Sequence, residues 1–287
     1  MFILMVKDRL ILGCLSILLL TACSSLQSRL EQAEILSTNN NFEKKIIGTT
    51  LFNLVSYQKI NVASKSAVIY IEGDGFAWKN KYTVSNNPTP NNPVALNLAA
   101  TDMSPIVIYL ARPCQFINID NETNCKPEYW TNKRASKEVI ESISTAIDSI
   151  KKELNINRLR LVGFSGGATI ATILAANRND VIDLRTIAGN IDIDKFVEVH
   201  NVSALTGSIN PTNYASRLVN IPQMHVISTE DSIITVDITN SYLKQLEKFD
   251  TNLKCVKVIK LSKPEHTKGW TDHWSTQNFS KVQSCID

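Results

Sequence analysis

The sequence has 287 residues, of which 44% are hydrophobic and 20% are charged, and its formal net charge is only +3. This composition is typical of a globular protein with a sizeable core, and it argues against a disordered chain. Lysine and arginine are scattered along the chain rather than clustered, so nucleic acid is not expected as a partner.

Residues 1–22 are predicted to be a signal peptide, because basic residues precede an apolar run at 10–20. The run is shorter than the roughly 20 residues that a membrane-spanning helix needs. It ends in Leu-Thr-Ala-Cys, which resembles the lipobox of bacterial lipoproteins. The resemblance implies a lipid on Cys23 that anchors the protein in a membrane. Ser24 directly after the cysteine resembles the sorting pattern of Gram-negative lipoproteins that reach the outer membrane, where the protein would face the periplasm. An ordinary secretory signal before a chance cysteine is the alternative.

After this segment, residues 23–45 are polar with a short helical pattern, which predicts either a tether or a first helix lying on the domain. From 46 to 287, apolar runs alternate with helical patterns, and no linker interrupts them. Strands that are apolar on both faces and separated by helices form a parallel sheet covered on both sides, so one α/β domain is predicted. The predicted strands lie at 46–57, 66–73, 104–112, 158–164, 184–189, 223–229 and 255–261, and the predicted helices at 131–155, 167–178, 239–249 and around Trp274.

Three of the ten glycines surround Ser165, in the sequence Gly-Phe-Ser-Gly-Gly at the junction of a buried strand and a helix. This is the G-x-S-x-G pattern of a nucleophile elbow. Gly163 and Gly167 lack side chains that would obstruct the close packing of strand and helix. G-x-G-x-x-G and the P-loop lysine, which mark nucleotide-binding turns, are absent. Ser165 is therefore predicted to be the nucleophile, and Gly166 is predicted to lend its backbone N–H to an oxyanion hole.

The acid of such a site follows the serine along the chain and lies just past a later strand. Asp231 occupies that position, with Glu230 as the weaker candidate. Asp192 and Asp194, after the preceding strand, are the fallback, and a turn or helix-capping role is the alternative for Asp231.

The base is expected in the loop after the last strand, where His266 lies. His273 competes with it, but lies in an expected helix where it would serve packing. His200 and His225 precede the acid and break the chain order, and His225 is expected to be a core residue within a strand.

A second oxyanion donor is expected from the loop after an early strand, where Gly73, Asp74 and Gly75 follow one another. The backbone N–H of Asp74 or of Gly75 is the candidate, and a plain turn is the alternative. No role for the Asp74 side chain follows from the sequence.

Residues 46–287 resemble the α/β-hydrolase superfamily, through the elbow at 163–167, Asp231 and His266. The resemblance implies an eight-stranded mixed sheet with the catalytic loops at its carboxyl edge. The chain departs from the family at 72–75, which reads Glu-Gly-Asp-Gly instead of a His-Gly motif, so the second donor stays open. An insertion at about 190–222 predicts a small cap over the pocket.

Four cysteines follow the signal peptide and Cys23, at positions 114, 125, 255 and 285. In an oxidising compartment they are expected to form two disulfides, with four buried thiols as the alternative. Cys114–Cys125 would close a short loop, and Cys255–Cys285 would tie the last strand to the C-terminal helix.

These features predict a serine hydrolase of the bacterial envelope that cleaves ester or related acyl bonds in a small-molecule or peptide substrate. Ser165, His266 and Asp231 would act through an acyl-enzyme. The same residues would serve a peptidase, a thioesterase or an acyltransferase, and a binding lipoprotein without catalytic activity is the rival from another class. No group of His, Cys and Asp has metal-ligand spacing, so neither a metal nor another cofactor is expected.

Overall fold

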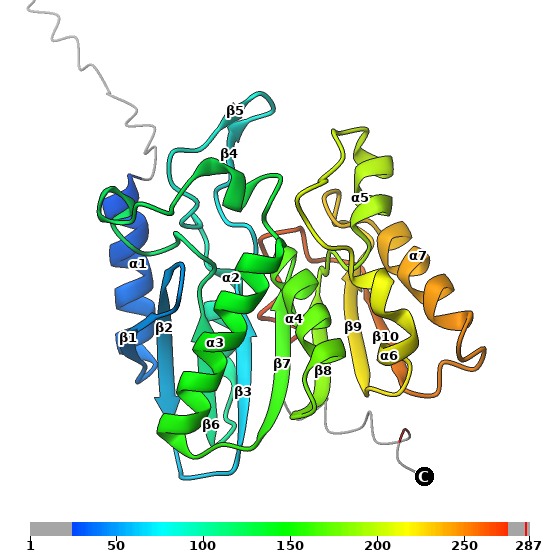
Figure 1. Cartoon of the computed structure of the whole chain (residues 1–287), viewed down its shortest axis with the longest axis horizontal. Helices are drawn as coiled ribbons and strands as arrows, with labels where there is room; N and C mark the ends of the chain where they lie inside the picture. Colours follow the sequence, from blue (N-terminus) through cyan, green and yellow to red (C-terminus); the bar gives the residue numbers. More distant parts are fainter. Residues whose placement is uncertain (1–24, 275–284, 286–287) are drawn as a thin grey trace, which may run out of the picture.

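An eight-stranded sheet runs through the centre of the protein (Figure 1). This computed structural model describes residues 25–274 and Cys285. The sheet is antiparallel only at one edge, where β1 pairs with β2 and β2 with β6, and it is parallel from β6 to β10. In spatial order the strands are β1 (Glu43–Gly48), β2 (Asn53–Ile60), β6 (Ile106–Leu110), β3 (Ser66–Ile71), β7 (Arg158–Phe164), β8 (Val181–Ile187), β9 (Gln223–Ser228) and β10 (Val256–Leu261). This topology confirms the predicted α/β class with a mostly parallel sheet.

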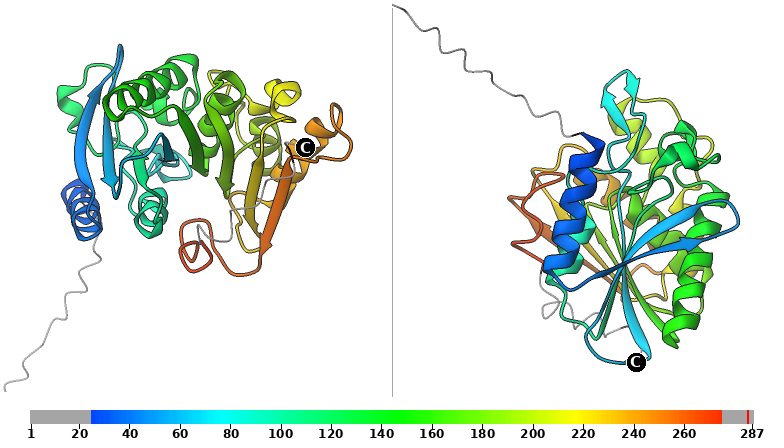
Figure 2. Two further views of the ribbon diagram at one scale, coloured as in Figure 1. Left: turned by 90° about the horizontal axis from the view of Figure 1, so that it is seen from below. Right: turned by 90° about the vertical axis from the view of Figure 1, so that its left-hand side faces the viewer.

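Helices cover both faces of the sheet (Figure 2). One face carries α3 (Lys137–Leu154), α4 (Gly166–Asn177), α6 (Ala215–Leu218) and α7 (Val236–Glu247), and the other carries α1 (Leu26–Asn39) and α2 (Val94–Thr101). Successive strand residues point to opposite faces, so Ile69 enters the core on the α3 side while Tyr70 enters the core on the α1 side. The protein therefore has two hydrophobic layers, one on each side of the sheet.

Two further elements stand beyond the edge where the parallel strands end (Figure 1). They are α5 (Ile193–His200) and a hairpin of β4 (Trp78–Asn80) and β5 (Thr83–Val84). Short 3-10 turns at Ile119–Asn121, Pro127–Trp130 and Pro211–Tyr214 complete the connections.

The strand predicted at 46–57 is in fact two antiparallel strands, because the chain turns between Thr49 and Phe52. The Thr49 backbone N–H and hydroxyl both donate to the Phe52 carbonyl, at 2.9 and 2.7 Å, and close that turn. β1 also begins at Glu43, before the predicted domain boundary at 46.

Helix α2 and the β4–β5 hairpin are absent from the prediction. Most of α2 is apolar and buried, and its N-cap is Pro93 without a capping side chain, so it lacks both the polar stripe and the start signal of an amphipathic helix. The helix predicted around Trp274 is a hydrogen-bonded turn as far as that residue, with the His273 N–H donating to the Trp270 carbonyl at 3.1 Å.

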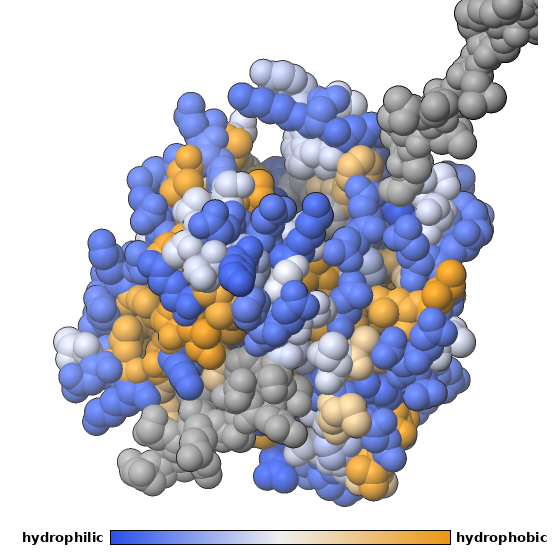
Figure 3. Space-filling view, turned by 180° about the vertical axis from the view of Figure 1, so that it is seen from behind, coloured by the Kyte–Doolittle hydropathy of each residue, from blue (hydrophilic) through white to orange (hydrophobic). Residues whose placement is uncertain are grey.

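At the N-terminus, the segment predicted as a tether or a helix forms α1, which packs its buried Ala33 against the domain. Arg29 of α1 donates to the Thr89 carbonyl. On the face that carries α1 and α2, hydrophobic side chains gather in patches among hydrophilic ones (Figure 3). The predicted signal peptide and Cys23 lie outside the described residues, and within the described part no helix is long and apolar enough to span a membrane.

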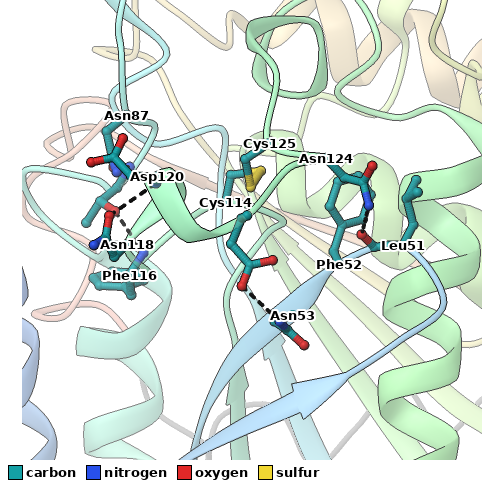
Figure 4. The surroundings of a disulfide bond; sticks show 12 residues. Leu51, Phe52, Asn53, Asn87, Cys114, Phe116, Asn118, Asp120, Asn124 and Cys125 are labelled. Atoms are coloured by element: carbon teal, nitrogen blue, oxygen red, sulfur yellow. Dashed lines mark hydrogen bonds between the residues drawn. A yellow bond between two sulfur atoms is a disulfide. The ribbon is translucent and has the colours of Figure 1, made fainter.

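Disulfide bonds join Cys114 to Cys125 and Cys255 to Cys285. The first closes the loop after β6, beside the turn between β1 and β2 (Figure 4). In that loop Asn124 donates to the Leu51 carbonyl at 2.9 Å, and the loop's Glu122 accepts from Asn53 at 2.8 Å. The loop is thus held at its base by one covalent bond and two side-chain contacts to the neighbouring hairpin.

Candidate active site

Ser165 lies on the sharp turn between β7 and α4, with φ 49° and ψ −120°. A non-glycine residue rarely adopts this backbone conformation, so the surrounding structure must hold it. Ser165 donates its N–H to the Ile187 carbonyl at 3.0 Å, and its own carbonyl accepts from Ala168 at 3.0 Å and from Asn190 at 3.1 Å. These bonds connect the turn to the adjacent strand β8 and fix the serine above the sheet.

The flanking glycines are required by close packing around this turn. A β-carbon at Gly163 would lie 2.4 Å from the Ala168 α-carbon, and one at Gly167 would lie 2.3 Å from the Ile71 carbonyl oxygen. Both distances are far below any permitted contact, so larger residues would push α4 away from β7 or β3. The glycines of the elbow therefore serve the approach of helix and strands, as the sequence predicts.

The structure brings Ser165, His266 and Asp231 together. His266 Nε2 lies 3.1 Å from Ser165 Oγ, and His266 Nδ1 lies 2.9 Å from Asp231 Oδ2. Asp231 is 3% exposed and Ser165 is 7% exposed, so both ends of this chain of hydrogen bonds are buried. In this arrangement the imidazole can accept the serine proton while the carboxylate holds its other nitrogen.

Local contacts fix the orientation of the acid and the base. The second oxygen of Asp231, Oδ1, accepts the backbone N–H of Ile233 at 2.8 Å and of Ile234 at 2.9 Å. The ring of His266 packs against Phe164 with centroids 5.2 Å apart, and its carbonyl accepts from the Trp270 indole at 2.9 Å. Asp231 thus has the turn-capping role that was its alternative, and it still presents one oxygen to the histidine.

The other acidic candidates lie elsewhere. Glu230 and Asp194 are exposed. Asp192 caps α5, accepting from the Lys195 N–H at 3.2 Å, and also accepts from the Ser241 hydroxyl at 2.7 Å.

The other histidines are also accounted for. His273 is exposed, and His200 lies at the cavity wall with Nε2 2.7 Å from the Ile233 carbonyl. His225 is fully buried in β9, with Nδ1 2.8 Å from the Thr186 hydroxyl, and burial lowers the pKa of its imidazole to about 3.

Two segments that carry the predicted oxyanion donors lie beside the nucleophile. Gly166 is the first residue of α4, where an N–H has no acceptor within the helix. The early loop passes beside the serine, since a β-carbon on Gly73 would lie 3.2 Å from Ser165 Cβ. Asp74 and Gly75 follow in the cavity wall, and Gly75 has φ +68°, which favours glycine. These two residues stay the predicted sources of a second N–H.

The side chain of Asp74 forms an ion-pair cluster that the sequence does not indicate. Its Oδ1 accepts from Arg112 Nη1 at 3.1 Å, and its Oδ2 accepts from Arg134 Nη1 at 2.8 Å. The carboxylate lies over the start of α4, because a β-carbon on Gly166 would come within 2.1 Å of Asp74 Oδ1. Arg112 lies two residues after the end of β6, so its place at the carboxyl edge could be predicted, whereas Arg134 comes from an irregular loop that gives no such signal.

Glu72 is buried beneath the early loop, and this burial raises the pKa of its carboxyl to about 7. It accepts from the Gly73 N–H at 3.0 Å, from the Tyr109 hydroxyl at 3.1 Å and from the Ala95 N–H at 3.4 Å. These bonds favour the ionised form but do not offset the loss of hydration.

A cavity of about 1200 Å³ opens at Ser165 and His266. The β4–β5 hairpin and α5 contribute to its wall. Asn190 lies in the wall, 2% exposed, and its Oδ1 has no hydrogen-bond partner among the described residues. The apolar part of the wall is formed by Phe76, Ala77, Trp78, Pro90, Phe164, Phe196, Val202, Ala204, Leu205, Ile233 and Ile234.

The predicted cap at 190–222 covers the cavity only with its first part. Asn190, Phe196 and the segment 200–205 line the cavity. The 3-10 turn Pro211–Tyr214 and α6 pack on α4 instead. Across the described residues, no group of three or more His, Cys, Asp or Glu side chains is placed to hold a metal ion.

Comparisons with known proteins agree with this architecture. The family model described as serine hydrolase (FSH1) matches residues 91–256. An esterase from Pyrococcus furiosus is similar over 87% of this chain and 93% of its own, with 14% identity and a TM-score of 0.58. Est1E from Butyrivibrio proteoclasticus is similar over 80% of this chain and 93% of its own, with 11% identity and a TM-score of 0.57.

An acylaminoacyl peptidase from Pyrococcus horikoshii is similar over 86% of this chain but only 42% of its own, with 12% identity and a TM-score of 0.58. Identities this low show a shared fold and no more. No curated protein matches the chain.

Proposed function

The chain belongs to the serine hydrolase (FSH1) family and is an α/β-hydrolase enzyme, and we propose that it cleaves carboxylic esters through a triad of Ser165, His266 and Asp231. The observation that carries the proposal is the continuous pair of hydrogen bonds from Asp231 Oδ2 through the imidazole to Ser165 Oγ, at 2.9 and 3.1 Å. The strained backbone of Ser165 supports it, because such strain concentrates at functional sites.

Acylation begins when Ser165 Oγ attacks the ester carbonyl and His266 Nε2 takes the hydroxyl proton. Asp231 holds the imidazole through Nδ1 and stabilises the imidazolium. The oxyanion accepts hydrogen bonds from the Gly166 N–H and from an N–H of the early loop. When this tetrahedral intermediate collapses, the bond to the alcohol oxygen breaks, and the leaving alcohol receives the proton from His266. Water then attacks the carbonyl of the acyl-enzyme while His266 takes a proton from it. When the second tetrahedral intermediate collapses, Ser165 Oγ receives that proton from His266 and the acid is released.

The same residues would also hydrolyse a peptide or a thioester, or transfer the acyl group from the serine to an acceptor other than water. The cavity wall supports an ester or small acyl substrate, since its apolar side chains accommodate acyl and alcohol groups. A substrate panel of esters, thioesters and peptides therefore accompanies the first experiment.

That experiment is labelling of the purified protein without residues 1–22 by a fluorophosphonate probe. The wild type is compared with Ser165→Ala and His266→Ala, and His273→Ala serves as the matched histidine control. We expect labelling in the wild type and in His273→Ala, and none in the other two variants. A folded wild type that is not labelled would contradict the proposal and favour the binding-protein alternative.

We further propose that the enzyme is anchored by a lipid on Cys23 and faces the periplasm from the outer membrane. This proposal rests on the sequence of residues 1–24. Metabolic labelling with a palmitate analogue in a Gram-negative host tests it, because Cys23→Ala should abolish both the label and the recovery of the protein in the membrane fraction. Equal labelling of both proteins would contradict the assignment of Cys23.

A further inference from the structure

The ion-pair cluster beside the nucleophile carries more positive than negative charge. Two guanidinium groups, those of Arg112 and Arg134, share the single carboxylate of Asp74. Glu72 is the other acidic residue in the described cavity wall, and its carboxyl is already occupied by the Gly73 N–H and the Tyr109 hydroxyl. Within the cluster, two guanidinium groups therefore share one carboxylate in their ion pairs.

The two arginines differ in what they face. Arg112 is 4% exposed, and its Nη2 donates to the Arg134 carbonyl, so it serves the protein framework. Arg134 lines the cavity and lies over the ring of Phe196 at 5.1 Å. One of its nitrogens, Nη2, is buried and has no hydrogen-bond partner among the described residues. A buried charged donor without a partner is costly, and a ligand that supplies an acceptor removes this cost.

Arg134 is also close to the reacting atoms through a short series of contacts. Its Nη1 bonds Asp74 Oδ2 at 2.8 Å, and the other oxygen of Asp74 lies against the Gly166 α-carbon, next to Ser165. A substrate whose carbonyl lies at Ser165 thus has Arg134 within reach of a group only a few bonds away. The Phe196 ring, which also lines the cavity, limits the movement of the guanidinium beside it.

We propose that Arg134 is a specificity-determining residue that selects esters with a carboxylate a few bonds from the scissile carbonyl. The inference rests on the proposed esterase function and deepens it by naming the substrate class. The carboxylate can belong to the acyl part or to the alcohol part of the ester, and two substrate pairs distinguish these sources.

The test compares kcat/KM for charged and neutral esters of matched shape. Monomethyl glutarate and methyl pentanoate differ only by a carboxylate or a methyl on the acyl part. Para-acetoxybenzoate and para-tolyl acetate differ in the same way on the alcohol part. The variants are Arg134→Met, which removes the charge, and Arg134→Lys, which keeps it. Lys133→Met is the control, because Lys133 pairs with Glu128 at 2.9 Å and lies outside the cavity wall.

We expect the wild type to prefer the charged member of one pair by at least about tenfold. Arg134→Met should lower kcat/KM for that ester by about 10- to 100-fold, as for the loss of a hydrogen bond to a charged group. The neutral ester should lose less than the charged one, because the loss of the Arg134–Asp74 ion pair affects both esters while only the charged ester loses a contact to the guanidinium. Arg134→Lys should retain part of the preference, and Lys133→Met should retain all of it. No preference in either pair, or an equal loss on both members in Arg134→Met, would overturn the inference.

A binding measurement separates failure of this inference from failure of the proposed function. In Ser165→Ala, which cannot turn over, the charged member of the preferred pair should raise the melting temperature, and the rise should vanish when Arg134→Met is added. A labelled, ester-cleaving wild type without this rise overturns the role of Arg134 alone. An unlabelled wild type that hydrolyses no ester overturns the esterase proposal, and the inference with it.

Discussion

The side-chain amide of Gln115 donates a hydrogen bond of 2.9 Å to the carbonyl oxygen of Gly73. Gln115 is 1% exposed, and its own carbonyl oxygen accepts the Arg112 N–H at 3.1 Å. The loop after β6 is thereby joined to the early loop that passes beside Ser165. The geometry of the proposed oxyanion hole thus depends on a residue that contacts neither the nucleophile nor its histidine.

Replacement of Gln115 by methionine should lower kcat by about tenfold or more, because it removes the side-chain hydrogen bonds to the Gly73 carbonyl, the Arg112 N–H and the Pro88 carbonyl while nearly preserving volume. The effect should fall on kcat rather than on KM, since the early loop acts on the transition state. Steady-state kinetics with a neutral ester measures this, and the thermal unfolding midpoint reports any loss of folded protein. An unchanged kcat in a folded variant would show that the early loop keeps its position without Gln115.

The disulfide Cys114–Cys125 should stabilise the same loop. Its cysteines are 11 residues apart, and loop-closure entropy for that separation corresponds to about 3 kcal/mol of folding free energy. The double variant Cys114→Ala/Cys125→Ala should lose a comparable amount of stability in urea denaturation. It should also lose activity, because the loop carries Gln115.

The matched control is Cys255→Ala/Cys285→Ala, whose bond lies at β10. It should also destabilise the protein but leave the kcat of the remaining folded enzyme within about twofold. Equal effects of the two double variants on kcat would argue against a specific link between the first disulfide and the early loop.

The residues that meet at the site could be predicted where chain order carries the information. Ser165 has its strand–turn–helix context, and Asp231 and His266 each follow a recognisable strand. The contacts of Arg134 could not be predicted, because the chain between β6 and α3 has no period that determines its path. Helix α2 could not be predicted for a related reason. Its apolar residues are not confined to one face at helical spacing, so the sequence lacks the period that marks an amphipathic helix.

Glu72 should make the protein less stable as pH rises from about 4.5 to about 7. Its pKa is raised from 4.5 to about 7 in the folded protein, mainly by burial. Between these values the folded state holds a proton that the unfolded state has released, so the free energy of unfolding falls with rising pH. The fall amounts to about 3 kcal/mol over this interval. Urea denaturation of wild type and Glu72→Gln at several pH values measures it as the difference between the two proteins.

Glutamine at position 72 keeps the size of the side chain and cannot titrate. The variant should therefore gain stability relative to the wild type as pH rises from 4.5 to 7 and 8. Parallel stability curves for the two proteins would contradict a raised pKa for Glu72.

His225 should have the opposite influence on the acid side. Burial lowers the pKa of its imidazole from 6.5 to about 3, so below pH 6.5 the unfolded state binds a proton that the folded state does not. The free energy of unfolding therefore falls as pH drops, by about 1.4 kcal/mol per unit between pH 6 and pH 4.

His225→Gln can keep a hydrogen bond to Thr186, which lies 2.8 Å from Nδ1, while removing the titration. We expect the stability advantage of the wild type over this variant to shrink steadily between pH 6.5 and pH 4 in urea denaturation. A difference that stays constant over this interval would mean that His225 is protonated in the folded protein or reached by water, in conflict with its full burial in β9.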